Sequence, residues 1–331
     1  MFKYIVKRLL LSVIILLGVS FIVYALVRMM PMNYVEIKYA SQLAQGTVKQ
    51  EDIDNFLKLY GLSDSVIVGY FRWLGSLLTG DLGISFKYEQ PVGTVIGDYM
   101  WISFAIALIA TILQFLIAIP LGISSATHQY SVRDYTVTVL TMIGLSFPTY
   151  FFAAICIRVF SVELGWLPSG GLVDPGVDYA TDFVGTMTKL GDMAYHLILP
   201  IIVSVVLSVG GLMRYTRTNT LEVLNADYIR TARAKGLSER TVIYKHAFRN
   251  TLIPLATLLA GIIPGLFGGM MITEEVFAID GIGRMAYRAL VEGDIPFVMG
   301  YNMFLAVLTV IGTLFSDIMY AIVDPRVKLT K

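Results

Sequence analysis

The residues best suited to bind another macromolecule lie in a polar, basic stretch at positions 222–254, between two apolar segments. Ala226, Ile229 and Ala232 recur at the spacing that puts side chains on one face of a helix, and two arginines lie beside them. A short helix of this kind suits insertion into an acidic-rimmed groove of a soluble partner. The alternative is that the cations only fix membrane topology and contact anionic lipid headgroups. Spacing alone does not separate the two.

Local turn chemistry predicts how this stretch folds. Gly236 follows a run of good helix formers and is expected to end the first helix in a left-handed conformation, with Leu237 as the accompanying apolar contact. Ser238 can then cap the N-terminus of a second helix that runs through residues 241–250. The sequence therefore predicts a helix, a turn and a helix.

Covalent chemistry is not expected of this chain. The sequence contains no Gly-rich phosphate loop ending in Lys and Ser or Thr, no His-Glu-x-x-His motif and no acidic metal pair. Its histidines, His128, His196 and His246, are too scattered for a sequence-local metal site, and Cys156 has no second cysteine to pair with. We expect a protein that is not an enzyme, does not itself hydrolyse ATP, and binds no cofactor or metal.

The composition predicts that the segments on either side of the basic stretch lie in a membrane. With 56% hydrophobic and 15% charged residues, the chain has too little polar surface to cover a soluble globule. Its net charge of +1 gives no argument for nucleic acid. Apolar runs long enough, or nearly so, to cross a hydrocarbon core of about 30 Å predict six transmembrane helices. They cover residues 9–27, 101–123, 135–157, 197–213, 251–273 and 295–316.

Charge asymmetry predicts the orientation. The first apolar run follows Lys3, Lys7 and Arg8, but it is too long for a signal peptide and no small-residue cleavage site follows it, so we expect it to be retained. Placing the N-terminus inside puts most basic residues on the cytoplasmic side and most acidic residues outside. Both termini are then cytoplasmic. Residues 29–100 lie outside, where the helical pattern of EDIDNFLKLYGL, ending at Gly61, predicts a small extracytoplasmic subdomain.

The fifth predicted span combines helix breakers with small residues. Pro264, Gly265, Gly268 and Gly269 are candidates for a gate or for the lining of a pathway, and ordinary helix packing is an equal alternative. Pro120 and Pro148 are expected to be ordinary kinks in the second and third spans. Two ionisable residues lie near span ends, Arg158 and Asp317. We expect them to have structural roles, because direct contact with a transported substrate is the weaker alternative.

The basic stretch carries a family resemblance. YIRTARAKGL followed by KHAFRNTLIP resembles the coupling loop of bacterial ABC-importer permeases, in the dipeptide and oligopeptide branch. Arg230 and Thr231 depart from the Glu-Ala-Ala of the wider family, whereas Ala232 and Gly236 keep their places. The resemblance implies that residues 228–237 form the helix that receives nucleotide-driven closure of the ATPases. The residues implied to couple to an ATPase are Ala226, Asp227, Tyr228, Ile229, Arg230, Thr231, Ala232, Arg233, Gly236 and Leu237.

The resemblance covers nearly the whole chain. It includes GDLGIS at residues 80–85, DPR at 324–326, and TEEVFAIDGIGR at 273–284, which is similar to the family's Glu-Val-Phe, Pro-Gly-Leu-Gly-Arg segment. Asp280 stands where that pattern usually has Pro, which puts the local backbone stiffness in doubt. The implied fold is an all-α polytopic membrane protein with six transmembrane helices, that is, the type I ABC importer permease fold with a small extracytoplasmic subdomain after the first helix.

These observations predict an organisation and a set of partners. Residues 1–30 are expected to form the cytoplasmic N-terminus and first span, 31–97 the extracytoplasmic segment, 98–324 a five-helix core with the coupling loop at 214–250, and 325–331 a cytoplasmic tail. By resemblance, the partners in the bacterial plasma (inner) membrane are a second homologous permease, two ATP-binding subunits and an extracytoplasmic substrate-binding lipoprotein, besides membrane lipid. ATP is used by the partner ATPases and nucleic acid is no partner.

Cargo is less well defined than machinery. The resemblance implies a permease for di- or oligopeptides delivered by the binding protein, and the same branch also serves nickel, glutathione and other small solutes. A second class, an ion-coupled secondary transporter, would need acidic residues near the middle of the membrane, and Asp317 alone is weak support. An intramembrane enzyme would need paired nucleophile, base or metal ligands at membrane depth.

Overall fold

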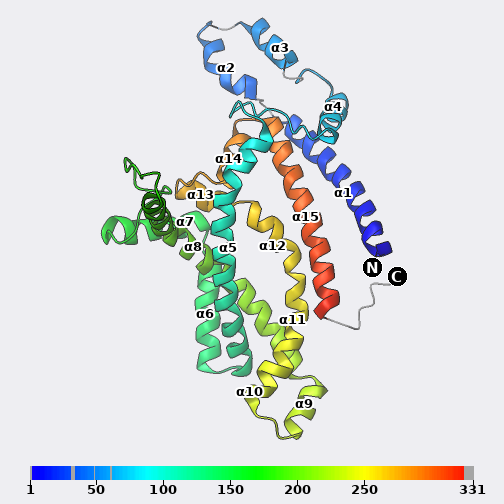
Figure 1. The fold of residues 1–331 in the computed structure, drawn as a ribbon, viewed down its shortest axis with the longest axis vertical. Helices are drawn as coiled ribbons and strands as arrows, with labels where there is room; N and C mark the ends of the chain where they lie inside the picture. Colours follow the sequence, from blue (N-terminus) through cyan, green and yellow to red (C-terminus); the bar gives the residue numbers. More distant parts are fainter. Residues whose placement is uncertain (1, 31–33, 48, 60–61, 324–331) are drawn as a thin grey trace.

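The computed structural model describes residues 2–30, 34–47, 49–59 and 62–323, and helices dominate this part of the chain (Figure 1). The only β feature in it is an isolated bridge between Ile84 and Pro91. The helices are α1 (Phe2–Arg28), α2 (Tyr34–Ala44), α3 (Gln50–Leu59), α4 (Val66–Leu78), α5 (Val92–Thr127), α6 (Val132–Ser146), α7 (Thr149–Cys156), α8 (Phe183–Leu224), α9 (Asp227–Ala234), α10 (Glu239–Thr241), α11 (Phe248–Thr257), α12 (Leu259–Phe267), α13 (Met271–Val276), α14 (Ile282–Val291) and α15 (Ile295–Val323). Two π-helical segments, η1 (Ile157–Glu163) and η2 (Val242–Ala247), complete them.

Four helices, α1, α5, α8 and α15, are long and apolar enough to cross a membrane, and a fifth span results if the bent pair of α6 with α7 and η1 counts as one. The all-helical membrane class is therefore confirmed, while the count of six spans stays a prediction. At 1.5 Å per residue the 42 residues of α8 extend roughly 63 Å, about twice the hydrocarbon thickness. This helix is therefore longer than a single membrane crossing requires.

The third predicted span is not one helix with an ordinary kink. α6 and the segment after it meet at an angle of 101°, at Phe147 and Pro148. Proline disfavours helical backbone in the residue before it, and Phe147 is indeed extended, with φ −79° and ψ 134°. Pro148 then starts a new helix, α7, as its N-cap. Pro120, by contrast, lies inside the continuous helix α5, and a kink there stays a prediction.

The fifth predicted span is also divided. α11 ends at Thr257, α12 begins at Leu259, and a separate short helix, α13, follows. Pro254 has no N–H, and the backbone nitrogens of Leu258 and Gly261 bond three residues back rather than four, which tightens the turn between the two helices. α12 ends at Phe267, six residues before the predicted end, because Gly269 takes a φ of +70°.

The core of the bundle is the long pairing of α5 with α8, onto which α6 packs. Glycines allow the backbones to approach. A Cβ at Gly122 of α5 would lie 2.7 Å from the Cβ of Thr216 in α8, and one at Gly210 of α8 would lie 2.4 Å from the carbonyl oxygen of Thr141 in α6. Close backbone contact of this kind drives helix association in membranes, where no hydrophobic effect acts between helices.

The segment after α1 folds as three further helices. α3 contains the predicted amphipathic pattern, which is confirmed as a helix, while Gly61 lies outside the described residues. α4 is fixed to α1 by a hydrogen bond between the hydroxyls of Ser20 and Tyr70, 3.0 Å apart, and the Arg28 guanidinium donates to the carbonyl oxygens of Leu62 and Asp64. Whether the segment is a subdomain of its own, with the predicted boundaries, stays a prediction.

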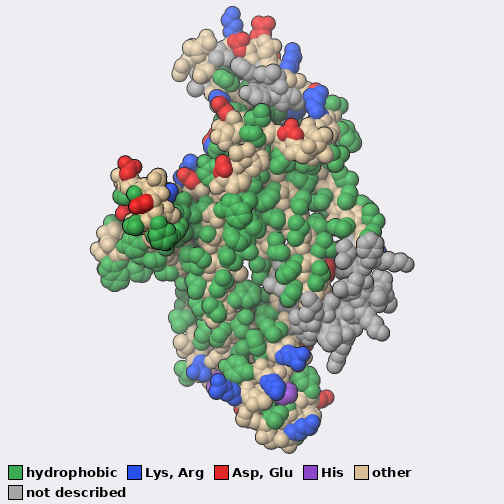
Figure 2. All heavy atoms as spheres, in the orientation of Figure 1, with side chains coloured by type: hydrophobic (Ala, Val, Ile, Leu, Met, Phe, Trp, Pro, Cys, Tyr) green, Lys and Arg blue, Asp and Glu red, His purple; other side chains and the backbone are tan. Residues whose placement is uncertain are grey.

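The surface separates into bands (Figure 2). Hydrophobic atoms cover the middle of the molecule, and Lys and Arg gather at the end formed by α9 and α10. The opposite end carries acidic and basic side chains together, and acidic side chains gather on the protrusion that contains α7 and the beginning of α8. This distribution is the one that a membrane protein with a basic cytoplasmic end should have.

Candidate coupling loop and membrane cavity

The basic stretch folds as the turn chemistry predicts. α9 ends at Ala234 with Lys235 as its C-cap, and Gly236 follows with a φ of +74°, so the left-handed cap is confirmed. Ser238 accepts a hydrogen bond from the backbone nitrogen of Thr241 and caps the next helical segment, as expected. That segment passes through η2 into α11. The helix, turn and helix are therefore present.

One expectation about this loop is wrong. Ile229 and Ala232, the apolar face expected to enter a groove on a partner, are 0% and 5% exposed. They pack against Val242 and Ala247 of η2, so the loop buries its own apolar face. The helix cannot offer these two side chains to a partner while the loop keeps this fold. They hold the two helical segments of the loop together.

The face of α9 that remains open is polar and cationic. Its exposed members are Asp227, Tyr228, Arg230, Thr231, Arg233, Lys235, Gly236 and Leu237, and Ala226 is half-buried. Arg233 pairs with Glu239 at 2.8 Å, and Arg230 lies 3.6 Å from Asp227. Pairs as exposed as these contribute roughly 0 to 1 kcal/mol, so the arginines can exchange partners at little cost.

A buried ion pair connects the membrane helices just before this loop. The Arg217 guanidinium of α8 donates to both carboxylate oxygens of Asp134 in α6, at 2.9 and 2.7 Å, and to the Ser125 hydroxyl of α5 at 3.1 Å. The Ser125 hydroxyl also donates to Asp134. The sequence places Arg217 only among the topology-setting cations, because its partners are 83 and 92 residues away. This cluster fixes three helices at the basic end of the bundle.

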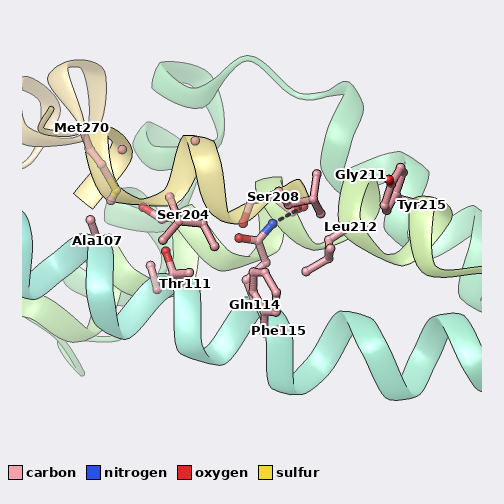
Figure 3. Close-up of a pocket in the computed structure, with 15 residues that line it drawn as sticks. Ala107, Thr111, Gln114, Phe115, Ser204, Ser208, Gly211, Leu212, Tyr215 and Met270 are labelled. Atoms are coloured by element: carbon pink, nitrogen blue, oxygen red, sulfur yellow. Dashed lines mark hydrogen bonds between the residues drawn. The ribbon is translucent and has the colours of Figure 1, made fainter. Parts of the chain in front are cut away.

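A cavity of about 580 Å³ opens between α5, α8 and α12 (Figure 3). Its polar groups are all neutral: Thr111, Gln114, Ser204, Ser208 and Tyr215 line it among apolar side chains. The Gln114 side-chain amide donates to the carbonyl oxygen of Ser208, 3.1 Å away, which holds it against α8. The carboxamide keeps its oxygen and its second N–H for other partners.

The predicted gate residues are brought together only in part. Gly265 lines the cavity, together with Gly261. Pro264 lies inside α12 and packs against Gly312 of α15, and Gly268 ends α12, where its carbonyl oxygen accepts from the Tyr301 hydroxyl. Gly269 does not face the cavity lining but the backbone of α14, since a Cβ there would lie 2.3 Å from the Gly283 nitrogen.

Sequence reasoning missed a buried carboxylate next to Met270, which lines the cavity. Glu274 in α13 is 1% exposed, and no described cation pairs with it. It accepts hydrogen bonds from the Ser103 hydroxyl at 2.7 Å and from the backbone nitrogens of Met270 and Arg284, both at 2.8 Å. Arg284 is the third residue of α14, so the carboxylate caps that helix, where the helix dipole favours a negative charge. Glu274 therefore fastens α5, α13 and α14 together.

A second buried carboxylate explains the GDLGIS motif. Asp294 is fully buried and accepts from the Ser85 hydroxyl, from the Lys87 backbone nitrogen at 3.0 Å and from the Phe297 backbone nitrogen at 3.2 Å. It therefore caps α15 and holds the motif against it. Within the motif, the Asp81 carboxylate accepts from the Gly83 nitrogen at 2.8 Å.

Ion pairs surround Asp280, the position where the family pattern usually has Pro. Asp280 accepts from Arg284 at 2.7 Å, which fixes a position that the sequence leaves in doubt. Glu275 accepts from Arg288 at 3.2 Å and from Arg284 at 3.0 Å. These hydrogen bonds, that from Arg288 above all, lower the pKa of Glu275 below its ordinary value of 4.5.

The two ionisable residues near span ends have protein partners. Asp317 forms an ion pair with Arg8 of α1, and Arg158 lies 3.0 Å from Glu163. Both contacts agree with the structural roles expected of these residues.

Comparison with known proteins decides the family. Residues 118–329 match the family described as binding-protein-dependent transport system inner membrane component, and residues 1–107 match its N-terminal part. The chain belongs to this family. It is 38% identical over 329 residues to the oligopeptide transport system permease protein AppB of Bacillus subtilis, covering 99% of this chain and 100% of the relative. It is 33% identical over 338 residues to the dipeptide transport system permease protein DppB of Alkalihalophilus pseudofirmus, covering 99% and 100%.

Membership fixes the type of protein. The chain is the multi-pass inner membrane component, or permease, of an ABC transport system that depends on a binding protein. ATP is used by separate ATPase subunits, so this permease is not an enzyme. The DPR motif that contributes to the resemblance lies outside the described residues.

Proposed function

We propose that this permease forms one half of the pathway of an ATP-driven importer for di- and oligopeptides. A second homologous permease would supply the other half, two ATPases would dock at the basic end, and a binding lipoprotein would deliver cargo at the opposite end. The N- and C-termini are cytoplasmic in this proposal. The positive charge gathered around α9 and α10 supports that orientation.

The observation that carries the cargo proposal is the neutral polar lining of the cavity between α5, α8 and α12. A peptide backbone presents uncharged N–H and C=O groups at every residue, and amide and hydroxyl side chains can both donate to it and accept from it. Such a lining is indifferent to the side chains of the peptide. The two relatives named above are described as oligopeptide and dipeptide permeases, which also supports this cargo.

Two alternatives are weaker. Nickel would favour imidazole or carboxylate ligands, and none is among the described residues that line the cavity. Glutathione or another small solute is an alternative cargo for the same transport machinery. An ion-coupled secondary transporter would need an acid free to bind the coupling ion, whereas Asp317 is paired with Arg8.

Uptake of labelled di-, tri- and pentapeptides, with nickel as the control cargo, tests the proposal. Cells that lack this gene should lose peptide uptake and regain it when the gene is restored. A Gly265→Leu variant should reduce uptake of the pentapeptide most, because Gly265 lines the cavity and a Cβ there would meet nothing within 4 Å. Loss of nickel uptake with normal peptide uptake would replace the cargo proposal while keeping the machinery.

Docking of an ATPase on α9 is tested by charge reversal. Arg230→Glu with Lys235→Glu changes two exposed cations on the open face of the helix and should reduce copurification of the ATPase subunits with the permease. Arg133→Glu is the matched control, since this exposed cation lies in the first turn of α6, outside the loop. Equal copurification of the double variant and the control would leave the loop cations with only a topological role.

A further inference from the structure

A cluster of metal-ligating side chains lies outside the cavity, where the segment between η1 and α8 folds onto the first turns of α8 (Figure 1). Asp174 comes from this segment, and Asp192 and His196 lie one turn apart on α8. One ligand atom of each residue lies within 4.8 Å of the others. The separation of these residues along the chain is why their spacing does not reveal the cluster in the sequence.

The geometry of the imidazole determines which nitrogen is available. His196 is 3% exposed, and its Nδ1 lies 3.0 Å from the backbone carbonyl oxygen of Asp192 and 3.1 Å from the carboxylate Oδ1 of the same residue, which would have to turn toward Nε2 to share an ion with it. A carbonyl oxygen only accepts, so Nδ1 carries the proton and the neutral ring has its lone pair at Nε2. Nε2 lies 3.6 Å from Oδ1 of Asp174, beyond hydrogen-bond length. A buried lone pair therefore faces a carboxylate, an arrangement that a cation between them would stabilise.

The Asp192 carboxylate is oriented by two donors. Its Oδ2 accepts from the backbone nitrogen of Asp174 at 2.8 Å and from the hydroxyl of Tyr179. Partners of this kind orient the ligands in metal sites and fix the imidazole tautomer.

We propose that Asp174, Asp192 and His196 form a binding site for Zn²⁺. One imidazole with two carboxylates suits zinc, whereas Ca²⁺ and Mg²⁺ prefer oxygen ligands alone. Ligands at about 2.0–2.2 Å around a tetrahedral ion lie roughly 3.3 Å apart, so the 3.6 Å between Nε2 and Asp174 needs little adjustment. The exposure of Asp174 leaves room for water as the fourth ligand.

The bound ion would fasten an outer segment at the entrance side of the permease. The same segment is attached to the α13 region, because the Gly171 backbone nitrogen donates to the carbonyl oxygen of Phe277 at 2.8 Å. Zinc bound by Asp174 would therefore link the same segment to α8 as well. This site shares no residue with the cavity lining and does not depend on which cargo the permease moves.

Zinc binding to the purified full-length permease in detergent, with any affinity tag removed, tests the proposal. Equilibrium binding of ⁶⁵Zn²⁺ should give one ion per chain, and zinc should raise the apparent melting temperature. Asp174→Asn should weaken binding at least about tenfold. Because Asp174 is 64% exposed at its side chain, this variant should fold normally. Asp178→Asn, an exposed acid of the same segment outside the cluster, should bind as the wild type does.

Three results would overturn the site. The first is no zinc bound at 0.1 mM, which is roughly the weakest affinity of interest. The second is equal binding by the wild type and Asp174→Asn, which would place the ion on another group such as His128 or His246. The third is a melting temperature of the wild type that zinc does not raise.

Discussion

The two ends of this permease are held together by different interactions. The basic loop around α9 has a small apolar cluster of four buried residues, with cations left open around it. At the outer end, two buried carboxylates, Glu274 and Asp294, each collect backbone and hydroxyl donors from elements far apart in the sequence. Both regions are short helices joined by glycine turns. The outer one contains buried carboxylates of its own, whereas at the basic end the buried pair of Arg217 with Asp134 lies in α8 and α6, before α9 begins.

The difference agrees with the roles proposed for the two ends. A loop with few buried contacts can shift as a unit when a partner pulls on its open face, since local stability follows the amount of buried surface. A carboxylate that satisfies three donors fixes their positions, because a displaced donor would be left unsatisfied in a buried environment. We therefore expect the outer hairpin of α13 and α14 to stay in place while the loop moves.

The largest effect is expected at Glu274. Glu274→Gln keeps the size of the side chain but turns one acceptor oxygen into an NH₂ that faces backbone N–H donors, so at least one hydrogen bond is lost in a buried site. The expected loss of stability is on the order of 2–3 kcal/mol. Thermal unfolding of the purified permease measures it, together with peptide uptake.

The neighbouring residue supplies the control. Glu275→Gln makes the same chemical change on a side chain that is 37% exposed. It should lower the melting temperature far less than Glu274→Gln does. If the two variants unfold at the same temperature, the buried carboxylate does not hold the outer hairpin, and the contrast between the two ends of the molecule is lost.

Gly269 in the outer region and Gly236 in the basic loop show the same difference in packing, with a smaller expected effect. Gly269 and Gly236 have nearly equal φ angles of +70° and +74°, so alanine costs about 1–2 kcal/mol of backbone strain at either. A Cβ at Gly269 would also lie 2.3 Å from the Gly283 nitrogen, whereas one at Gly236 meets nothing within 4 Å. Gly269→Ala should therefore lower the melting temperature more than Gly236→Ala does. Gly75→Ala, inside α4 with open space around it, should be neutral or stabilising.

A bulkier substitution at Gly236 tests whether the turn after α9 takes part in coupling. Gly236→Val adds a branched side chain to a left-handed position, which should distort the turn between α9 and the following helix. Peptide uptake should fall while the permease is still inserted in the membrane at the normal amount, as immunoblotting of membranes can measure. Normal uptake by a stably inserted Gly236→Val variant would contradict the assignment of this turn to coupling.

Sequence alone was informative where neighbours along the chain determine the structure. Gly236 and Ser238 could be assigned because a left-handed cap and an N-cap depend on adjacent residues. It could not show that Gly269 packs against Gly283, because that residue lies on another helix, and the gate role of Gly269 stays a prediction. It also missed the contact of Ser103 with Glu274 and that of Ser85 with Asp294, whose partners are 171 and 209 residues apart.

The smallest predicted effect is the loss of folding stability at low pH when Glu275 is protonated. The pKa of Glu275 is lowered by hydrogen bonds from Arg288 and Arg284, so its ionised form stabilises the folded state above the ordinary value of 4.5. This contribution is lost as pH falls through the lowered pKa, because the protonated carboxyl no longer pairs with the arginines. The side chain is 37% exposed, and solvent screening limits the contribution to at most about 1 kcal/mol.

Melting temperatures of the wild type and Glu275→Gln between pH 7 and pH 3.5 measure this contribution. The wild type should be the more stable at pH 7, and the difference should disappear toward the acidic end. Glu239→Gln provides the comparison at the basic loop, where the pair with Arg233 is more exposed, with 61% of the Glu239 side chain accessible, and should contribute less at every pH. A larger effect at Glu239 than at Glu275 would mean that the loop is held as firmly by its charges as the outer hairpin is, and that its freedom to move must come from elsewhere.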